Sequence, residues 1–587
     1  MKRIDPVTVE VVRSNLLAAA KDMSETLKRT ATHPRIYEYG DFVVALYDSD
    51  VNLIADVPGV NIFLGTIGFC IKSSCVDDIG LENLKPGDVV LTTHPYRSST
   101  HTADGTLIMP VFYKGELVAY AGTKAHMGDT GAKDWYPTDT VSMYQEGLIF
   151  EAVKIWKRGE LDKELWRTLL ANSRRADVLA GSVNAMRNAC TVGKRRITSL
   201  IEKFGLDMVR ACIKEILDHG ERVTRRGIQK IPEGTYPAPD DYLDDDGIVL
   251  DKPVKIKVTV KVRGNDMIVD LTGSSKAVKG PLNSPYGSTY SAAAWGFRAI
   301  TAPQISSNEG CLRPLEVIAP SGSIFNPEPP APTWLYWMSA LRIMELVPRA
   351  LADVLPPGKV PAGSGGGVGG VGLVSTNPHT KAFTFMGTSD AIGQGSTVFH
   401  DGENALIHYC NGGCRNTPAE VVEITWDQDG HTGEILRYEL NQDSGGPGKY
   451  RGGLGIIKDY TVSKYGGDVL VLQERCRVSR PWGLHGGKPA KVMNHTILFP
   501  GTDKEKVERR KHWIKGVPPF SVVRWVSGGG GGYGDPFERD PELVHSDVMN
   551  EYVSIESARE DYGVVIDLKT LQIDMKATNE LRDNNTR

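Results

Sequence analysis

Residues 92–131 read TTHPYRSSTHTADGTLIMPVFYKGELVAYAGTKAHMGDTG, and they decide how the rest of the chain is interpreted. They contain two H-x-x-D pairs, His101 with Asp104 and His126 with Asp129. The apolar runs LIMPVFY and ELVAYAGT between the pairs are typical of two strands joined by a tight turn. Such a hairpin can bring His101 and His126 to the same end of a sheet, with Asp104 on the connecting loop.

The side-chain types in this stretch point to a transition metal. Imidazole and carboxylate together suit Zn²⁺, Mn²⁺ or Fe²⁺ better than Ca²⁺ or Mg²⁺, which prefer all-oxygen sites. We therefore interpret residues 92–131 as the walls of a metal-centred active site. The spacing leaves one alternative open, a loop network in which the histidines and carboxylates pair with one another.

The composition indicates an ordinary globular protein. The chain has 587 residues, of which 40% are hydrophobic and 24% charged, and its formal net charge is −4. This length suits several packed domains, and the lack of a basic excess makes a nucleic-acid partner unexpected. The eight cysteines are scattered, which favours reduced thiols. With no secretory signal and no apolar run of about 18–20 residues, we expect a cytoplasmic protein without membrane contact.

An amphipathic helix is predicted directly after Asp5-Pro6, which is a good helix start. Apolar residues recur every three or four positions in VTVEVVRSNLLAAAKDMSETLKRTA, and His33-Pro34 predicts the end. Two strands, FVVALY and NLIAD, follow. Asp41 precedes the first strand, where a carboxylate is most often a turn or cap residue.

Changes of periodicity divide the chain into five regions and predict an α+β fold with mixed β-sheets and long helices. The regions are an N-terminal α+β metal-site region (1–140), a helical region (141–230), a mixed α/β region (231–360), a glycine-rich β region (361–540) and a C-terminal helical tail (541–587).

The glycine run GSGGGVGGVG, residues 363–372, does not meet the requirements of a nucleotide site. A phosphate cradle needs a strand before it and a helix start after it, whereas LVSTNP and KAFTFMG after the run look like strands. Closely packed or flexible backbone is the favoured interpretation. Because no G-x-x-x-x-G-K-[ST] motif occurs, we do not expect this chain to hold ATP alone. Cys410 and Cys414 lack a second cysteine pair at metal-site spacing and are interpreted as a turn.

Ten motifs spread along nearly the whole chain resemble one family. They are DPVTVEVVRSNL (5–16), DFVVALYDSD (41–50), STHTADGTLIMPVF (99–112), QEGLIFEAVKI (145–155), VKGPLNSP (278–285), NEGCLRPLEVIAPSGSIFNPEPPAP (308–332), RNTPAEVVE (415–423), LNQDSGGPGKYRGGLG (440–455), PWGLHGGKP (481–489) and GGGGYGDPFERDPELV (529–544). On these residues the sequence resembles the hydantoinase B/oxoprolinase family. That family includes the B subunits of N-methylhydantoinase and caprolactamase, the large subunits of acetone and acetophenone carboxylases, and the C-terminal part of 5-oxoprolinase.

The resemblance implies a hydantoinase B-like fold with a metal centre. The family's metal ligands map onto Asp41, His101, Asp104 and His126, which would hold a divalent transition metal such as Zn, Mn or Fe. The resemblance thus favours a ligand role for Asp41 over a turn role. Asp129 is expected beside the last ligand, as its neighbour or as a catalytic base, and Asp41 is the other candidate base.

The resemblance also implies a partner. A hydantoinase A-type subunit with an actin-like ATPase fold would bind ATP and phosphorylate the small-molecule substrate, and the two subunits would form a hetero-oligomer such as a heterotetramer. This chain would then hydrolyse a phosphate-activated cyclic amide or imide, as one subunit of an ATP-dependent cyclic amidohydrolase. Two alternatives stay open: a subunit of an ATP-dependent ketone carboxylase, and a non-catalytic scaffold subunit.

The surroundings of the expected ligands depart from the family's pattern. Family members commonly read NDPYxGGTH and AHxxDVGG, where this chain has THPYRSSTH (93–101) and AHMGDTGA (125–132). The ligand residues are present and their neighbours differ, which leaves the substrate open. The chain length resembles the hydantoinase and lactamase subunits more than the longer acetone carboxylase subunit, and this favours a hydrolase.

Overall fold

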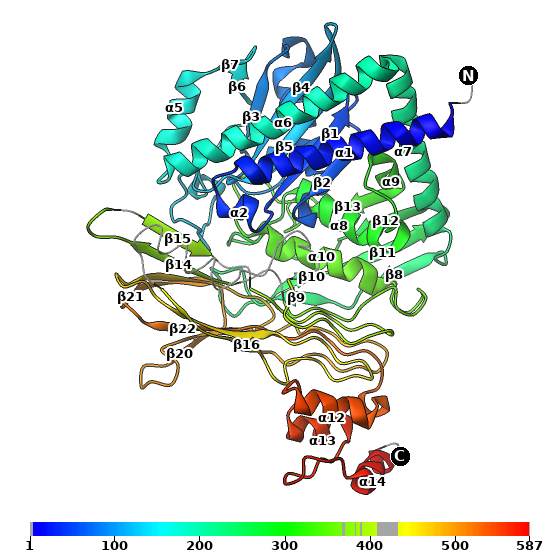
Figure 1. The fold of residues 1–587 in the computed structure, drawn as a ribbon, viewed down its shortest axis with the longest axis vertical. Coiled ribbons are helices and arrows are strands. Elements are labelled where there is room, and N and C mark those ends of the chain that lie inside the picture. The colour runs from blue at the N-terminus through cyan, green and yellow to red at the C-terminus, as the bar shows by residue number, and fades with distance from the viewer. Residues whose placement is uncertain (1–3, 367–369, 382, 388–389, 408–432, 586–587) are drawn as a thin grey trace. The chain divides into compact units, whose positions relative to one another are not determined.

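The computed structural model describes residues 4–366, 370–381, 383–387, 390–407 and 433–585 (Figure 1). Within them the chain forms two compact units. The first contains the residues up to Asp241 together with Lys255–Val354, and the second contains Tyr242–Val254 and most of the described chain from Leu355 onwards. Helices and several sheets are present, as the α+β prediction requires. The five predicted regions remain predictions, and Cys410 and Cys414 lie outside the described residues.

A seven-stranded antiparallel sheet organises the first unit. In spatial order its strands are β2 (Leu53–Pro58), β1 (Phe42–Asp48), β5 (Glu116–His126), β4 (Asp104–Tyr113), β3 (Val89–Thr92), β6 (Val153–Lys157) and β7 (Glu160–Leu161). The predicted hairpin is the central pair, β4 and β5. Lys114 and Gly115 both have positive φ angles, 49° and 87°, which is the tight turn that matches the twist of the two strands.

Two long helices, α1 (Pro6–Thr30) and α6 (Ala176–Phe204), cover one face of this sheet (Figure 1). The predicted N-terminal helix is therefore confirmed, and the Asp5 carboxylate caps it by accepting hydrogen bonds from Val7 N and Thr8 N. Leu16 and Met23 of α1 are buried in one hydrophobic cluster with alternate residues of the central strands, among them Leu107 and Ala121. Because side chains alternate across a strand, the residues between these point to the other face.

The rest of the first unit completes the support of the sheet. A four-stranded sheet contains β13 (Leu315–Ile318), β12 (Asp266–Asp270), β11 (Thr259–Arg263) and β8 (Gly234–Pro237), with β12 and β13 parallel. The helices α7 (Leu206–Ile228), α8 (Tyr286–Thr301) and α10 (Tyr336–Ala350) contact its strands. The shorter helices are α2 (Pro34–Tyr37), α3 (Thr66–Cys70), a π-helix η2 (Ile71–Ile79), α4 (Pro95–Ser98), α5 (Lys163–Ala171), α9 (Glu309–Leu312) and the single turns η1 (Asn61–Phe63), η3 (Leu81–Asn83) and η4 (Met143–Gln145). A separate two-stranded pair, β9 (Asp241–Leu243) with β10 (Val254–Ile256), is formed at the two ends of Tyr242–Val254, the segment that belongs to the second unit.

The second unit consists mainly of two antiparallel sheets around a shared hydrophobic cluster that includes Val469 and Trp525. One sheet has the order β15 (Phe383–Gly387), β14 (Gly370–Thr376), β18 (Gly467–Leu472) and β21 (His512–Val517). The other has the order β16 (Ile435–Leu440), β17 (Ile456–Thr461), β22 (Val522–Val526), β19 (His495–Leu498) and β20 (Lys506–Glu508). A single turn, η6 (Pro536–Glu538), and the helices α12 (Pro541–Met549), α13 (Ile555–Tyr562) and α14 (Met575–Asn585) end the described chain.

The glycines of the second unit permit backbone segments to lie in direct contact. A Cβ atom added to Gly530 would lie 2.0 Å from the Gln394 carbonyl oxygen, and one added to Gly365 would lie 2.2 Å from that of Gly528. No residue larger than glycine fits such distances. The prediction of closely packed backbone is therefore confirmed at Gly365, inside the run that had suggested a nucleotide site.

A search of the described helices for a membrane span finds none of the required length and apolarity.

The packing of α1 on the sheet generates a stability prediction. Because Leu16 is 2% exposed within the main cluster, Leu16→Ala should lower the free energy of unfolding by ~2–5 kcal/mol, measured by urea denaturation. Val7 lies on the same helix and is 68% exposed, so Val7→Ala should change it by no more than about 0.5 kcal/mol. Equal effects of the two substitutions would contradict the placement of the helix.

Candidate metal centre

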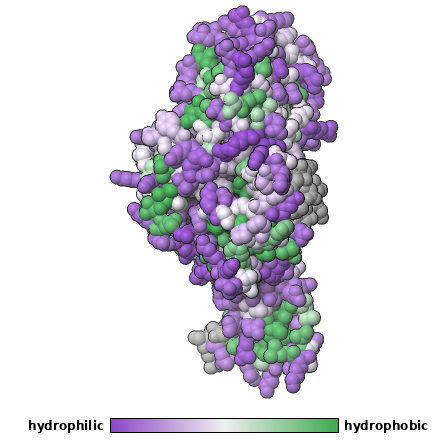
Figure 2. Space-filling view, turned by 90° about the vertical axis from the view of Figure 1, so that its left-hand side faces the viewer, coloured by the Kyte–Doolittle hydropathy of each residue, from purple (hydrophilic) through white to green (hydrophobic). Residues whose placement is uncertain are grey.

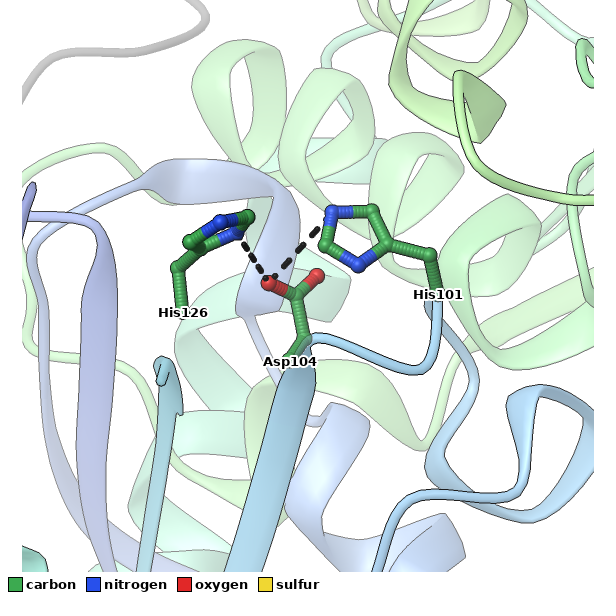
Figure 3. A group of neighbouring side chains, drawn as sticks. All are labelled: His101, Asp104 and His126. Atoms are coloured by element: carbon green, nitrogen blue, oxygen red, sulfur yellow. Dashed lines mark ion pairs between the residues drawn. The ribbon is translucent and has the colours of Figure 1, made fainter. Parts of the chain in front are cut away.

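Three predicted ligands lie together in the first unit (Figure 3). The Asp104 Oδ1 atom is 3.3 Å from His126 Nδ1 and 3.6 Å from His101 Nε2. One possible ligand atom from each of the three side chains lies within 4.8 Å of the other two. All three residues are buried, with exposures between 1% and 5%. The structure therefore brings the first H-x-x-D pair together with the histidine of the second pair as a His-Asp-His group.

Strand register explains how residues distant in sequence meet. Asp104 begins β4 and is paired directly with His126, the last residue of β5. Directly paired residues on neighbouring antiparallel strands project to the same face with Cβ atoms about 4.5–5.5 Å apart. Because the face lined by Leu107 and Ala121 is taken by the helices, the odd spacing from those residues places Asp104 and His126 on the opposite face. His101 reaches them from the loop that enters β4, where Asp104 N donates to the His101 carbonyl.

Burial keeps the two imidazoles neutral. Loss of hydration lowers the pKa of His101 to about 3, although the Asp104 carboxylate opposes this effect, and lowers the pKa of His126 well below its usual value. Neutral imidazole is the form that binds metals. The pair of histidines therefore offers lone pairs, and Asp104 offers a carboxylate between them.

The donor set fits a transition metal on three observations. Asp104 Oδ1 is buried and accepts no hydrogen bond in the described structure, so it is an orphaned oxygen aimed at two imidazole nitrogens. The separations of 3.3 and 3.6 Å are close to the spacing of about 3.3–3.5 Å between ligands held tetrahedrally at about 2.0–2.1 Å. The third observation is the mixed nitrogen and oxygen chemistry of the set.

One contact of His101 bears on its tautomer. His101 Nδ1 accepts a hydrogen bond of 3.2 Å from Ala103 N, which places the proton of the neutral ring on Nε2. A metal at Nε2 requires that proton on Nδ1, so metal binding at this atom and the Ala103 hydrogen bond exclude each other.

Three aromatic side chains, Trp334, Tyr336 and Tyr136, contact the His-Asp-His group, and we call them the aromatic wall. The ring of Trp334 stacks on His101 with centroids 4.6 Å apart and an interplanar angle of 15°. The Tyr336 hydroxyl donates to Asp104 Oδ2 at 3.1 Å, which directs the other oxygen of this carboxylate towards the histidines. Tyr136 lies over His126 with centroids 6.2 Å apart. Hydrogen bonds from neighbouring residues to a ligating carboxylate orient it and tune its affinity.

Glu146 holds this wall in place. Its buried carboxylate accepts hydrogen bonds from the backbone N–H groups of Thr333 and Trp334 and from the hydroxyls of Thr140 and Thr333. Burial raises the pKa of Glu146 to about 7, while these hydrogen bonds act to lower it. The Glu146 carbonyl also accepts from the Thr102 hydroxyl, next to His101. One residue thus positions both the stacking indole and the loop of the first histidine.

Asp41 lies at the edge of the group. It precedes β1, its carbonyl accepts from His126 N, and its Oδ2 atom is 3.9 Å from His126 Nδ1. Burial and the neighbouring Asp104 charge raise the pKa of Asp41 to about 7, while Arg35, with Nη1 3.9 Å from the same oxygen, opposes the shift. The Asp41 side chain is one-fifth exposed. Its assignment as a fourth ligand or as the base remains a prediction.

Asp129 is engaged elsewhere. Its carboxylate accepts hydrogen bonds from Gly131 N at 3.1 Å and Arg174 N at 2.6 Å, and Arg174 Nη1 lies 3.5 Å away. Among the described residues it is outside the group that could hold a metal ion. These bonds fix the turn after β5, and the assignment of Asp129 as a base remains a prediction that this geometry does not support.

Several residues of the site were not singled out from the sequence: Arg35, Tyr136, Glu146, Trp334 and Tyr336. The run TWLYWM, residues 333–338, carried a signal, since its aromatic and large apolar residues follow the proline-rich PEPPAP. Its approach to residues 101–104 depends on contacts between segments more than 200 residues apart, which sequence periodicity does not report.

The site lies within a region that matches a family model. The model described as Hydantoinase B/oxoprolinase matches residues 5–536. The chain belongs to the hydantoinase B/oxoprolinase family. The family predicted from the sequence motifs is thereby confirmed.

Hydantoinase B/oxoprolinase relatives occur in two lengths. The B-type subunit of a putative D-/L-hydantoinase from Pseudomonas sp. (strain NS671) is 33% identical over 99% of this chain and 98% of its own length. Caprolactamase subunit beta of Pseudomonas jessenii is 31% identical over 99% of this chain and 100% of its own length. The 5-oxoprolinase of Dictyostelium discoideum is 28% identical over 90% of this chain but only 40% of its own length. Separate subunits and longer chains therefore share this region.

Two solved structures confirm the fold. The ATP-dependent caprolactamase from Pseudomonas jessenii matches with a TM-score of 0.90 at 29% identity, over 99% of this chain and 100% of that chain. A nucleotide-free acetone carboxylase matches with a TM-score of 0.90 at 20% identity, over 99% of this chain and 83% of that chain. The second likeness concerns the fold alone.

The geometry predicts how metal content depends on two aspartates. We expect the purified protein to bind one transition-metal ion per chain and Asp104→Ala to lose it, because Asp104 Oδ1 lies between both imidazoles. Asp129→Asn is the control and should retain the metal, because the Asp129 oxygens bind backbone N–H groups. Elemental analysis of both variants provides the measurement. If the Asp104→Ala variant retained the metal and the Asp129→Asn variant lost it, Asp129 and not Asp104 would be the ligand.

Proposed function

We propose that this chain is the metal-binding catalytic subunit of an ATP-dependent complex that hydrolyses a phosphate-activated cyclic amide or imide. The convergence of His101, Asp104 and His126 carries the proposal, because a scaffold has no need of a buried carboxylate oxygen without a hydrogen bond. The hydantoinase and caprolactamase names of the full-length relatives support the substrate class. A hydantoinase A-type subunit would bind ATP and phosphorylate the substrate, and together the two would form a hetero-oligomer such as a heterotetramer.

We assign different roles in the reaction to different residues of the site. A bound Zn, Mn or Fe ion would be held by His101, Asp104 and His126, and it would supply Lewis acidity and a water of lowered pKa. Asp41 is the carboxylate placed to accept a proton beside the ligands, since it lies 3.9 Å from His126 Nδ1 and is partly exposed. The rings of Trp334 and Tyr136 make the site partly apolar and exclude water from it, which strengthens charge interactions there.

A phosphorylated substrate also requires a positive charge. Among the described residues, the charges of Lys124 and Arg35 act on His101. The first, Lys124, is fully buried and donates to the Ser98 carbonyl. The second, Arg35, is one-fifth exposed and lies over the Tyr136 ring, 5.0 Å from its centroid. An incoming anion can reach Arg35, and a guanidinium suits phosphate geometry. We therefore assign Arg35 to the phosphate of the activated substrate.

The proposed function is tested by separating ATP use from hydrolysis. The chain and its A-type subunit are copurified and screened for ATP-dependent ring opening of lactams, hydantoins and 5-oxoproline. Asp104→Asn should abolish ring opening while the complex still assembles and still converts ATP to ADP in the presence of substrate. Full ring opening by Asp104→Asn would support the scaffold alternative. Turnover of ketones that depends on bicarbonate would instead assign the ketone carboxylase, which shares the fold.

Arg35 gives a second prediction at this site. Arg35→Met should lower kcat/KM for ring opening about tenfold or more, because a charge-assisted hydrogen bond to phosphate is lost, while ADP formation continues. Arg35→Lys should recover part of the loss. Arg29→Met, at an exposed position near the end of α1, is the matched control and should have no effect. If the Arg35→Met variant opens as many rings per ADP formed as the wild type does, the phosphate of the activated substrate does not bind at Arg35.

A further inference from the structure

The C-terminal segment 541–587 lies beyond the residues that the family model matches. The family model ends at residue 536, before α12 begins. The hydantoinase and caprolactamase subunits match 99% of this chain, whereas the longer 5-oxoprolinases of Dictyostelium discoideum and Saccharomyces cerevisiae match 90%. The family model spans the same share of the chain as those 5-oxoprolinase matches. The segment is therefore matched in separate subunits and falls outside the family model.

The segment is held firmly at its inner side. The Arg539 guanidinium, 2% exposed, donates to Asp401 and to Asp547, with distances between 2.7 and 2.8 Å. Ser554 N donates to the Asp443 carboxylate at 2.9 Å. The segment also has its own hydrophobic cluster, made of Val544, Val553, Ala558, Tyr562, Val564 and Ile566. It is thus a folded part of the second unit with a defined outer surface.

Apolar side chains are exposed on that outer surface. Five large apolar side chains are exposed, and we call them the C-terminal patch: Leu543 (51%), Met549 (53%), Leu568 (73%), Leu571 (38%) and Met575 (48%). Figure 2 shows apolar residues gathered on the surface of this part of the chain. Exposed apolar groups surrounded by polar ones are typical of a protein–protein interface.

The segment that carries the patch has a negative net charge. Residues 541–587 include ten acidic and five basic side chains, a net charge of −5, while the whole chain carries −4. The acidic excess of the protein is therefore concentrated in this segment. An acidic segment favours a partner with a basic surface and makes association depend on salt.

We propose that the C-terminal patch is a docking surface for the separate A-type subunit. In a fused chain the two halves are held at high effective concentration by the covalent link, whereas separate subunits need additional contact area to overcome the entropy of association. A segment shared with the separate subunits and lying outside the common region meets that need. This inference rests on the proposed function, which supplies the A-type partner.

The test uses the full chain with the patch made polar. Leu568→Ser, Leu571→Ser and Met575→Ser are combined, and binding to the purified A-type subunit is measured by titration at low and high salt. The control combines Leu436→Ser, Val507→Ser and Phe520→Ser, which are also exposed and lie in the same unit. We expect the patch variant to bind about tenfold or more weakly, the control to bind as the wild type does, and wild-type binding to weaken with salt.

Each outcome decides a different point. Unfolding temperatures and metal contents equal to those of the wild type would show that the patch variant is folded, and the single substitution Leu568→Ser provides a milder second variant. Equal binding by wild type and patch variant would overturn the docking proposal and leave the proposed function intact. Self-association of the chain that the patch variant loses would also overturn it, in favour of a second copy. If the wild type does not bind the A-type subunit, the partner in the proposed function is wrong, and the docking proposal falls with it.

Discussion

The direct pairing of Asp104 with His126 across β4 and β5 is the constraint on which the site depends. A shift of one residue in this register would turn one of the two side chains into the helix-covered face and would separate the ligands. The tight turn at Lys114-Gly115 and the alternating packing of Leu107 and Ala121 against the helices fix the register. The apolar core therefore determines the chemistry on the opposite face of the same sheet.

The buried position of this pair explains the rest of the surroundings. A carboxylate and two imidazoles removed from water are costly unless their polar atoms find partners. Tyr336 satisfies one oxygen of Asp104, and the other is left facing the imidazoles. Trp334, from a segment far along the chain, stacks on the ring of His101, and Glu146 holds Trp334 in place. A cation at the centre would complete this arrangement, because it supplies the one partner that the described side chains do not.

The N-terminal helix and the central hairpin could be predicted from the sequence, because each depends on a local pattern of apolar residues. The N-terminal helix followed from apolar spacing and the central hairpin from two apolar runs around a turn. The spacing along that hairpin predicted that His101 and His126 lie at one end of the sheet, and the family resemblance implied the ligand set. Spacing alone does not distinguish a metal site from a network of paired histidines and carboxylates, because spacing along the chain does not report distances between side chains. The partners of Asp129 could not be predicted from the sequence, since its carboxylate is bound by Arg174 N, a contact made only when the segment before α6 reaches the turn after β5. The aromatic wall was missed for the same reason, because Trp334 and Tyr336 meet residues 101–104 only through the tertiary fold.

The central claim is that His101, Asp104 and His126 hold a metal ion. Anomalous diffraction from crystals of the purified protein, collected at the absorption edges of zinc, manganese and iron, tests it most directly. The account predicts a single strong peak about 2.0–2.2 Å from Asp104 Oδ1 and from one nitrogen of each histidine. Crystals of metal-containing protein with no peak at this position, and with the histidines hydrogen-bonded to the carboxylates instead, would contradict it.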